Sequence, residues 1–236
     1  MLTLSANSTI GIAGGGLLGR LLAWQLLEAG HQVTVYDAGA FDDTPSAANT
    51  AAGMISPISE AIDTEPLMYH LGMLGLQQWP LWLAQLSAVT AQTPVHYEQN
   101  GSLIVAHHRD RLLLQQYSQD IQKHLPASAQ SQWLDKQGIT ALETDVADHF
   151  QQGVFLPQEG HIDNRRLLKA LLQRIQQLGG QCIGHTPVDV EPHKVYILSE
   201  KRHMAFDCVM DCRGVGAKPQ WKGVRGVRGE ILRVTT

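Results

Sequence analysis

Hydrophobic and polar residues change their spacing twice within the first forty residues of the chain. Ile10 and Ile12 stand among small residues, a pattern typical of a strand that is buried on both faces. Residues 31–37 then alternate apolar and polar positions, as a second strand does. Between the two strands, apolar residues recur at helical spacing: Leu17, Leu18, Leu21, Leu22, Leu26 and Leu27. The pattern predicts a β–α–β unit whose helix ends at Gly30.

The rest of the chain shows the same patterns over shorter stretches. We expect helical pieces at residues 66–79 and 81–88, meeting near Pro80, then a helix at 109–123 and another that begins at Asp163 or Asn164. Thr140 and Glu143 have the spacing of a capping box that opens a short helix. Strands are expected at residues 95–98 and 101–106, joined by a turn at 99–101, and at 153–157, 181–185, 195–198, 204–206 and 208–212.

This order of elements predicts an α/β fold with an interruption. The parallel sheet that begins in residues 10–37 resumes only near residue 181, and the block between them carries its own helices and strands. We therefore expect a Rossmann-like domain made of residues 1–60 and 161–225. An inserted α+β lobe would comprise residues 61–160 and 226–236.

Three glycines at the first strand-to-helix turn supply a dinucleotide-binding motif. Gly14 permits the tight turn, Gly16 lets the backbone approach a pyrophosphate, and Gly19 lets the helix pack close to the strand. Asp37 ends the second strand, where such folds use a carboxylate to accept a hydrogen bond from a ribose hydroxyl. An acid here argues against the 2′-phosphate of NADP, which leaves NAD or FAD.

The segment after Asp37 separates these two cofactors. In a simple NAD domain the next β–α unit comes directly after the acid, but here a small-residue loop and a long insertion intervene. Residues 46–57 are small and almost uncharged. Such a stretch is either an ordinary surface loop or a segment whose backbone lies against a large flat ligand, and composition alone leaves both open.

Composition and charge narrow the function classes. The net charge of −4 provides no general attraction to nucleic acid, and the basic residues near the C-terminus are interpreted as a solvated face. Three cysteines are too few and wrongly spaced for a zinc site, and none of the eleven histidines has the spacing of a metal ligand. Polar residues within 67–86 oppose a membrane span, and the N-terminus lacks a signal peptide's charged region. We expect a cytoplasmic protein without a bound metal.

Several motifs together resemble the D-amino-acid oxidase superfamily of FAD-dependent oxidoreductases, and most of all its glycine oxidases of the thiamine-pathway type. The motifs are the glycine turn ending at Asp37, Ala51-Ala52-Gly53-Met54 with the following Ile55-Ser56-Pro57, Asn100-Gly101-Ser102-Leu103, Gly160-His161-Ile162-Asp163, His185-Thr186-Pro187-Val188 and Val227-Arg228-Gly229-Glu230. The resemblance runs along nearly the whole chain and implies FAD as the cofactor.

The resemblance also implies which residues contact FAD. The backbone at Leu17 and Leu18 would face the pyrophosphate, Asp37 the adenosine ribose, and the backbone of Val188 the adenine. Ala47 and Ala48 would line the phosphate side, while Ala52, Gly53 and Met54 would lie beside the flavin ring. The full set of predicted cofactor contacts is Gly14, Gly16, Leu17, Leu18, Gly19, Asp37, Ala38, Ala47, Ala48, Ala52, Gly53, Met54, Val188 and Gly214.

Two departures from the family pattern bear on the site. Arg213 stands before Gly214, where the family usually has a small residue or threonine. Family members also continue well beyond Thr236, through the arginine that grips the substrate carboxylate. The resemblance therefore implies that the inserted lobe is incomplete at its C-terminal end, and no residue here is assigned the carboxylate-gripping role or a catalytic one.

The implied activity is oxidation of the C–N bond of a small amino acid or amine, with hydride transfer to the flavin. The alternatives are an FAD-binding fragment without turnover and an FAD enzyme of another branch, such as one that modifies a tRNA base. The acidic net charge argues against the tRNA branch. The oligomeric state is left open, a homo-oligomer included.

Overall fold

The chain divides into two compact units in the computed structural model, which describes residues 5–42, 46–89 and 94–231. Unit 1 comprises residues 1–52, 84–95 and 163–236, and unit 2 comprises residues 53–83 and 96–162. Residues 84–89, 94–95 and 226–231, which the sequence assigns to the inserted lobe, lie in unit 1. Residues 232–236 of the predicted lobe lie outside the described residues. The assignment of cofactor and substrate to separate domains stays a prediction.

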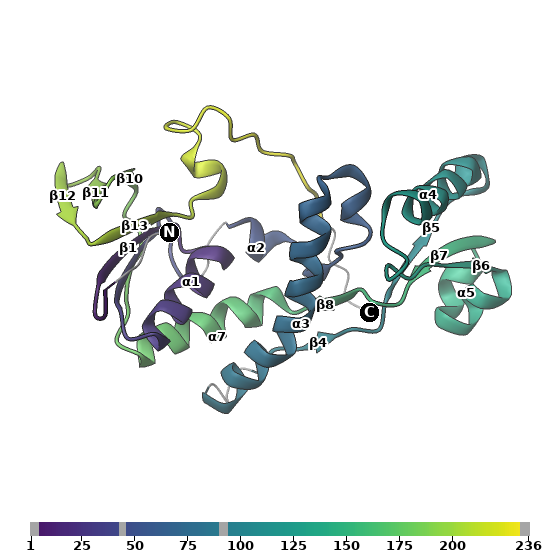
Figure 1. Ribbon diagram of the computed structural model, residues 1–236, viewed down its shortest axis with the longest axis horizontal. Coiled ribbons are helices and arrows are strands. Elements are labelled where there is room, and N and C mark those ends of the chain that lie inside the picture. Colours follow the sequence, from purple (N-terminus) through teal and green to yellow (C-terminus); the bar gives the residue numbers. More distant parts are fainter. Residues whose placement is uncertain (1–4, 43–45, 90–93, 232–236) are drawn as a thin grey trace. The chain divides into compact units, whose positions relative to one another are not determined.

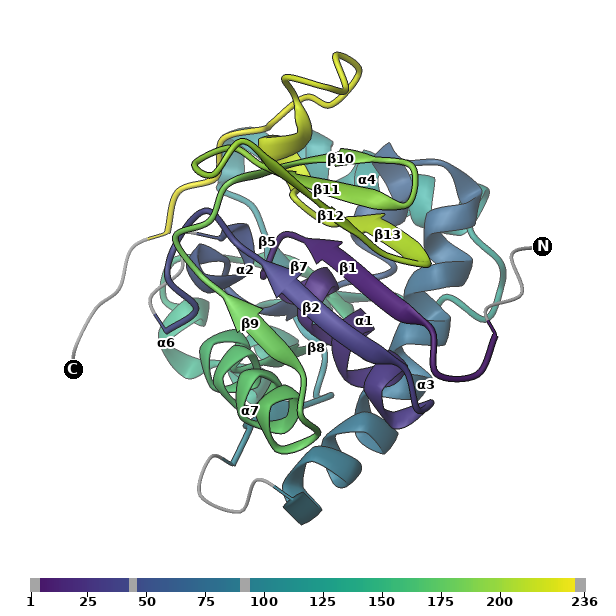
Figure 2. The same ribbon diagram turned by 90° about the vertical axis from the view of Figure 1, so that its left-hand side faces the viewer.

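A four-stranded parallel sheet forms the centre of unit 1 (Figures 1 and 2). Its strand order is β13-β1-β2-β9. The four strands are β1 (Thr9–Ala13), β2 (Gln32–Tyr36), β9 (Gln181–Ile183) and β13 (Cys208–Asp211). The predicted parallel sheet, begun near the N-terminus and resumed after a long insertion, is therefore confirmed.

Two helices cover one face of this sheet, α1 (Leu17–Glu28) and α7 (Asn164–Gln177), which pack against each other (Figure 1). Trp24 of α1 and Leu171 of α7 are both almost completely buried. The Asp163 carboxylate caps α7 by accepting a hydrogen bond from the Arg166 backbone N–H, 2.9 Å. α1 ends at Gly30, as predicted, and α7 ends at Gly179; both glycines have a positive φ, +86° and +80°.

A three-stranded antiparallel sheet packs on the other face of the parallel sheet (Figure 2). Its strands are β10 (Val188–Glu191), β11 (Lys194–Ile197) and β12 (Arg202–Ala205). Their apolar side chains join Ala13 and Tyr36 in one core cluster. Gly11 of β1 leaves space for the ring of Phe206, because a Cβ there would lie 2.7 Å from that ring.

Unit 2 contains two separate antiparallel sheets of three strands each, in the orders β3-β8-β4 and β5-β7-β6. The strands are β3 (Met54–Ile55), β4 (Tyr97–Glu98), β5 (Ser102–Val105), β6 (Gln132–Asp135), β7 (Gln152–Leu156) and β8 (Gly160–Ile162). The remaining elements of the chain are the helices α2 (Ala47–Thr50), α3 (Pro66–Val89), α4 (Arg111–His124), α5 (Lys136–Leu142) and α6 (Thr144–Ala147), with the 3-10 turns η1 (Glu60–Asp63), η2 (His108–Asp110) and η3 (Gly214–Ala217).

A buried carboxylate holds the loop after β3 in unit 2. Glu159 is fully buried, and its Oε1 accepts hydrogen bonds from the backbone N–H groups of Ile58 (3.0 Å) and Ser59 (2.7 Å). Its Oε2 accepts a bond from the Ser59 hydroxyl at 3.2 Å. The carboxylate thereby joins two segments about a hundred residues apart, and Ile58 enters a core with Leu114.

The predicted turn at residues 99–101 joins β4 to β5, which do not pair with each other. β4 pairs with β8, and β5 pairs with β7, so the strands on either side of the turn lie in different sheets. Gly101 has a φ of +94° and brings its backbone against the Phe155 ring. The two strands and the turn between them are therefore present as predicted, and the turn redirects the chain from one sheet to the next.

Two helix boundaries also differ from the prediction. α3 continues through Pro80 as one helix, because a proline removes only one N–H donor and neighbouring turns keep their bonds. Thr140 lies inside α5, where its hydroxyl donates to the Lys136 carbonyl at 2.8 Å. The side chain that caps α5 is Asp135, which accepts from the Gly138 N–H. Within the described residues, no helix combines the length and the apolar character that a membrane crossing requires.

Candidate functional site

A pocket of about 660 Å³ lies in unit 1 at the carboxyl ends of the parallel strands. Gly14 follows β1, Asp37 follows β2 and Cys212 follows β13, and all three line the pocket. The chain leaves β1 toward β2 on one side, while β13 pairs with β1 on the other. Such a reversal of strand order is where open α/β sheets bind ligands.

The packing of the protein accounts for two of the three motif glycines. Gly14 has a φ of +103°, and its N–H donates to the Tyr36 carbonyl at 2.7 Å, which closes the turn. A Cβ at Gly19 would overlap the Gly14 carbonyl oxygen, so the helix approaches the loop this closely only with glycine. Both roles match those that the motif predicts.

No packing contact among the described residues explains why position 16 is a glycine. Of these residues, a Cβ there would meet only Ser46, whose Cβ would lie at an ordinary distance of 3.7 Å. Gly16 lines the pocket and is the N-cap of α1, and no side chain caps the helix at this end. The first N–H groups of α1 therefore remain available, and a helix N-terminus attracts anionic groups such as phosphates.

The Asp37 carboxylate is held in place by backbone groups on both sides. Oδ2 accepts a hydrogen bond from the Gly15 N–H at 2.6 Å, and Oδ1 accepts one from the Gly39 N–H at 2.7 Å. Each carboxylate oxygen has two acceptor sites, so each keeps capacity for a further donor. A positioned carboxylate at the pocket wall can accept a bond from a hydroxyl of a bound ligand.

The predicted alanines line the pocket on a short helix that α7 holds. Ser46 caps α2, and its side chain accepts from the Asn49 N–H at 3.2 Å. The Asn164 amide donates to the carbonyls of Ala48 and Ala51. Asn164 is therefore a positioning residue, and the sequence suggested only a capping role for it.

Arg20 supports the glycine loop from beneath, and the sequence analysis missed it. It is almost fully buried, and its guanidinium donates to three carbonyls, those of Gly15 (2.6 Å), Phe41 (2.7 Å) and Leu168 (2.7 Å). Burial lowers the pKa of Arg20, although an arginine keeps its proton at neutral pH. An arginine on an apolar helix face was the one available sequence signal for this role.

Arg213 fills the place where the sequence departs from the family pattern. Its guanidinium bonds both carboxylate oxygens of Asp211, at 2.9 and 2.7 Å, and donates to the Val188 carbonyl at 2.8 Å. It also pairs with Asp189 at 3.2 Å. The bonded guanidinium lowers the pKa of the Asp211 carboxyl below its ordinary value. Arg213 thus ties β13 to β10 at the pocket wall.

Two of the cysteine thiols, those of Cys182 and Cys212, are neutral at physiological pH. Burial raises the pKa of Cys212, which lines the pocket, and of Cys182 to about 11 each. Both thiols are free and half-buried. A neutral, partly covered thiol is a poor nucleophile, so neither residue is a candidate for covalent chemistry.

The pocket gathers most of the predicted cofactor contacts. Those lining it are Gly14, Gly16, Leu17, Asp37, Ala38, Ala47, Ala48, Val188 and Gly214. The lining does not include Leu18, Gly19, Ala52, Gly53 and Met54. Leu18 and Gly19 lie in the first turn of α1, whereas Gly53 and Met54 belong to unit 2. The contacts of all these residues with a cofactor stay a prediction.

These features define an α/β dinucleotide-binding protein. They are the parallel sheet, the glycine turn at a helix N-terminus and the acid at the end of the second strand. Over residues 9–236 the chain matches the family described as FAD dependent oxidoreductase, and it belongs to that family. FAD is the cofactor of this family, which confirms the cofactor that the resemblance implied.

Individual relatives agree with this assignment. The chain is 31% identical over 230 residues to a Rhizobium etli protein that bears the name of a thiamine biosynthesis oxidoreductase, ThiO. That match covers 95% of this chain and 60% of the relative, so the chain spans less than two thirds of the relative's length.

Solved structures show the same fold at lower sequence identity. Glycine oxidase from Geobacillus kaustophilus matches with a TM-score of 0.75 and 21% identity, over 89% of this chain and 57% of that one. Iminodiacetate oxidase from Chelativorans sp. BNC1 matches with a TM-score of 0.71 and 22% identity, over 93% and 58%. These likenesses confirm the α/β fold.

Proposed function

We propose that the unit 1 pocket binds FAD and that the chain serves an enzyme oxidising the C–N bond of a small amino acid or amine. The observation that carries the FAD assignment is Gly16, because no contact with a described residue explains its missing side chain. The similarity to ThiO, and to enzymes named as oxidases of glycine and of iminodiacetate, supports the substrate class.

The residues of the pocket fit the parts of FAD. The N–H groups at Leu17 and Leu18 would hold the pyrophosphate, since α1 has no capping side chain there. Asp37 would accept a bond from the adenosine ribose, and Val188 would contact the adenine through its backbone. Arg20 acts indirectly, by holding the Gly15 carbonyl and thereby the shape of the loop.

When bound, FAD supplies the redox chemistry by accepting a hydride from the substrate carbon next to nitrogen, so that the substrate is oxidised and FAD is reduced. The residues of the chain bind and orient in this proposal, and none is assigned as an acid or base. Ala52, Gly53 and Met54 would lie beside the flavin ring, as the family resemblance implies.

The first test compares two glycine-to-alanine substitutions. In Gly16→Ala the new methyl group meets, among the residues that the structure describes, only Ser46, and φ there is −74°, so the fold is expected to tolerate it. The methyl group would point into the space proposed for the pyrophosphate. We therefore expect at least tenfold weaker FAD binding with unchanged thermal unfolding of the FAD-free chain.

Gly75→Ala in α3 is the matched control, because a Cβ there meets nothing within 4 Å. FAD binding is followed by flavin fluorescence and by chromatography of the cofactor released on heating. Equal FAD affinity for Gly16→Ala and the unaltered chain would remove the main support for this pocket.

The substrate class needs a separate measurement. Chain reconstituted with FAD is mixed with glycine, other small amino acids and simple amines, and flavin bleaching under anaerobic conditions is recorded. Bleaching by one of them supports the proposed activity. If FAD is bound but none of these compounds bleaches it, the proposed activity of this chain is contradicted while the proposed FAD site is not. That result is expected of an FAD-binding fragment without turnover.

A further inference from the structure

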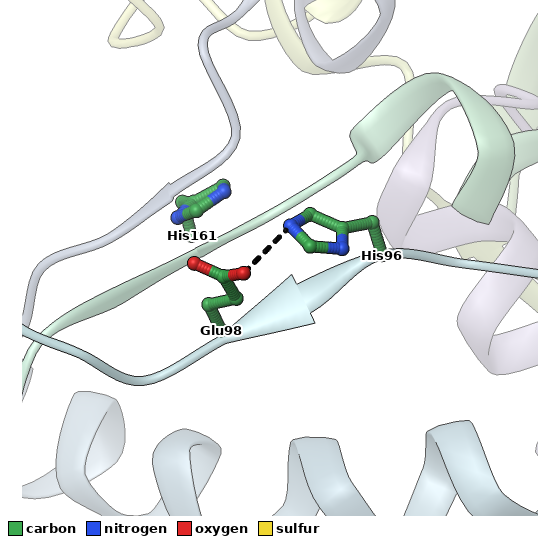
Figure 3. Close-up of side chains that lie close together, drawn as sticks. All are labelled: His96, Glu98 and His161. Carbon is green, nitrogen blue, oxygen red and sulfur yellow. Dashed lines mark ion pairs between the residues drawn. The ribbon is translucent and has the colours of Figure 1, made fainter.

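A cluster of two histidines and one glutamate lies on the sheet β3-β8-β4 of unit 2 (Figure 3). Glu98 of β4 stands directly opposite His161 of β8 in the antiparallel ladder. His96 precedes Glu98 by two residues, and side chains two apart on an extended chain point to the same face. The ladder thus brings together residues that are more than sixty positions apart.

The distances suit a shared ligand. His96 Nε2 lies 3.2 Å from Glu98 Oε1, and the rings of His96 and His161 have centroids 5.5 Å apart. One donor atom from each of the three side chains lies within 4.8 Å of the other two. Figure 3 shows the three side chains pointing toward one another.

Two imidazoles and a carboxylate are a donor set that binds divalent transition metals. Ligand atoms at about 2.1 Å from a tetrahedral zinc ion lie roughly 3.4 Å apart. Both His96 and His161 are exposed, so small side-chain rotations can bring the donors from their present spacing to that one. Three protein ligands leave the fourth position to water, as in zinc sites that remain open.

We propose that His96, Glu98 and His161 form a binding site for a divalent transition-metal ion with the preferences of Zn²⁺. Among the described residues, no other group of three or more such donors lies close enough to hold a metal ion. The site lies within unit 2 and its argument does not depend on the proposed FAD binding.

A second histidine–glutamate pair in the chain provides a natural control. His203 Nε2 lies 3.1 Å from Glu191 Oε1, with exposures close to those of His96 and Glu98. There the second oxygen of Glu191 binds the Lys194 ammonium at 2.9 Å, where a metal site would have a third donor. A pair without a third ligand should bind zinc weakly.

The spacing of histidines along the chain offered no sign of this site. His96 and Glu98 form a two-residue pattern that is common on exposed strands, and His161 joins them only through the pairing of β4 with β8. The absence of a metal, expected from spacing alone, therefore conflicts with this proposal.

The test is calorimetric titration of the tag-free 236-residue chain with Zn²⁺, after treatment with a chelator. We expect one site per chain, with micromolar affinity. Glu98→Gln and His161→Asn should each weaken zinc binding by about tenfold or more, and His203→Asn should leave it unchanged. Circular dichroism of each variant checks that the fold is kept.

Co²⁺ is the second probe, because its visible absorption reports the geometry of its ligands. A band of tetrahedral intensity that disappears in His161→Asn supports the proposal. The proposal of a metal site is overturned if the chain binds no Zn²⁺, or if His161→Asn and Glu98→Gln bind Zn²⁺ as tightly as the unaltered chain does.

Discussion

Each unit buries one charged side chain against the main chain, and the two charges are opposite. In unit 1 the Arg20 guanidinium donates to three carbonyl oxygens, and in unit 2 the Glu159 carboxylate accepts from two N–H groups and a hydroxyl. Neither residue forms an ion pair within the described part of the chain. Polar groups of the backbone therefore replace a counter-ion in both units.

Arg20 and Glu159 differ in how easily another residue type could form the same hydrogen bonds. A guanidinium reaches three carbonyls because its donors form a rigid planar fork, and no other side chain does so. A carboxylate is closely imitated by an amide of the same shape, which keeps one acceptor oxygen. We therefore expect Arg20 to be irreplaceable and Glu159 to be partly replaceable.

Arg20→Met should have the largest effect on stability. It leaves the carbonyls of Gly15, Phe41 and Leu168 without their buried donors, and each loss costs about 1–3 kcal/mol. We expect the free energy of unfolding to fall by about 4 kcal/mol, measured by urea denaturation.

Arg20→Lys should recover little of this loss, because one ammonium cannot reach three carbonyls. Arg202→Met is the control, since Arg202 bonds Glu200 on the surface, and it should change the free energy by less than about 0.5 kcal/mol. Full stability in Arg20→Lys would contradict the proposed difference between the two buried charges.

Glu159→Ala should have the next largest effect. It leaves the N–H groups of Ile58 and Ser59 unpaired, and we expect a loss of about 3 kcal/mol in the free energy of unfolding. Glu159→Gln keeps an acceptor toward both N–H groups and should lose only about 1 kcal/mol. Thermal unfolding of both variants measures the difference, and equal losses would show that the charge rather than the acceptor matters.

The smallest expected effect on stability is that of acid on the ion pair between Asp211 and Arg213. Arg213 lowers the pKa of Asp211 in the folded chain, so the pair stabilises the fold above the unfolded-state pKa of about 4. That contribution is lost as the pH falls through the lower folded-state pKa. Asp211→Asn should therefore cost about 1 kcal/mol at pH 7 and less at pH 3.

The pH dependence is followed by urea denaturation at both pH values. Asp120→Asn is the control, because the one ionic partner of Asp120 among the described residues is the distant and exposed His124, at 3.9 Å. An effect of Asp211→Asn that stays the same at pH 3 would show that the substitution acts through packing.

The distance along the chain between interacting residues decided which features could be predicted from the sequence. The turn at Gly14 and Gly19 and the carboxylate at Asp37 belong to one β–α–β unit, whose periodicity is local. The strands of unit 2 are as short as two residues, and their partners lie far along the chain. A turn signal at residues 99–101 could not show that its two flanking strands pair elsewhere.

The contacts by which Arg20, Asn164 and Arg213 support the pocket were not predicted, for the same physical reason. Arg20 bonds residue 168, Asn164 bonds Ala48, and Arg213 bonds Val188, all across long separations. Residue type alone marks an arginine or asparagine as a surface residue. Only the folded backbone shows that carbonyl groups converge on it.

The position of β1 between β2 and β13 has a consequence for synthesis on the ribosome. β2 and α1 leave the ribosome soon after β1, but β13 is made about two hundred residues later. At 5–20 residues per second, the nascent chain carries an open, hydrophobic edge at β1 for roughly 10–40 s. Open strand edges recruit other chains. We expect newly made protein to depend on chaperones during that interval, which ends when residues 208–211 pair with the strand that was made first.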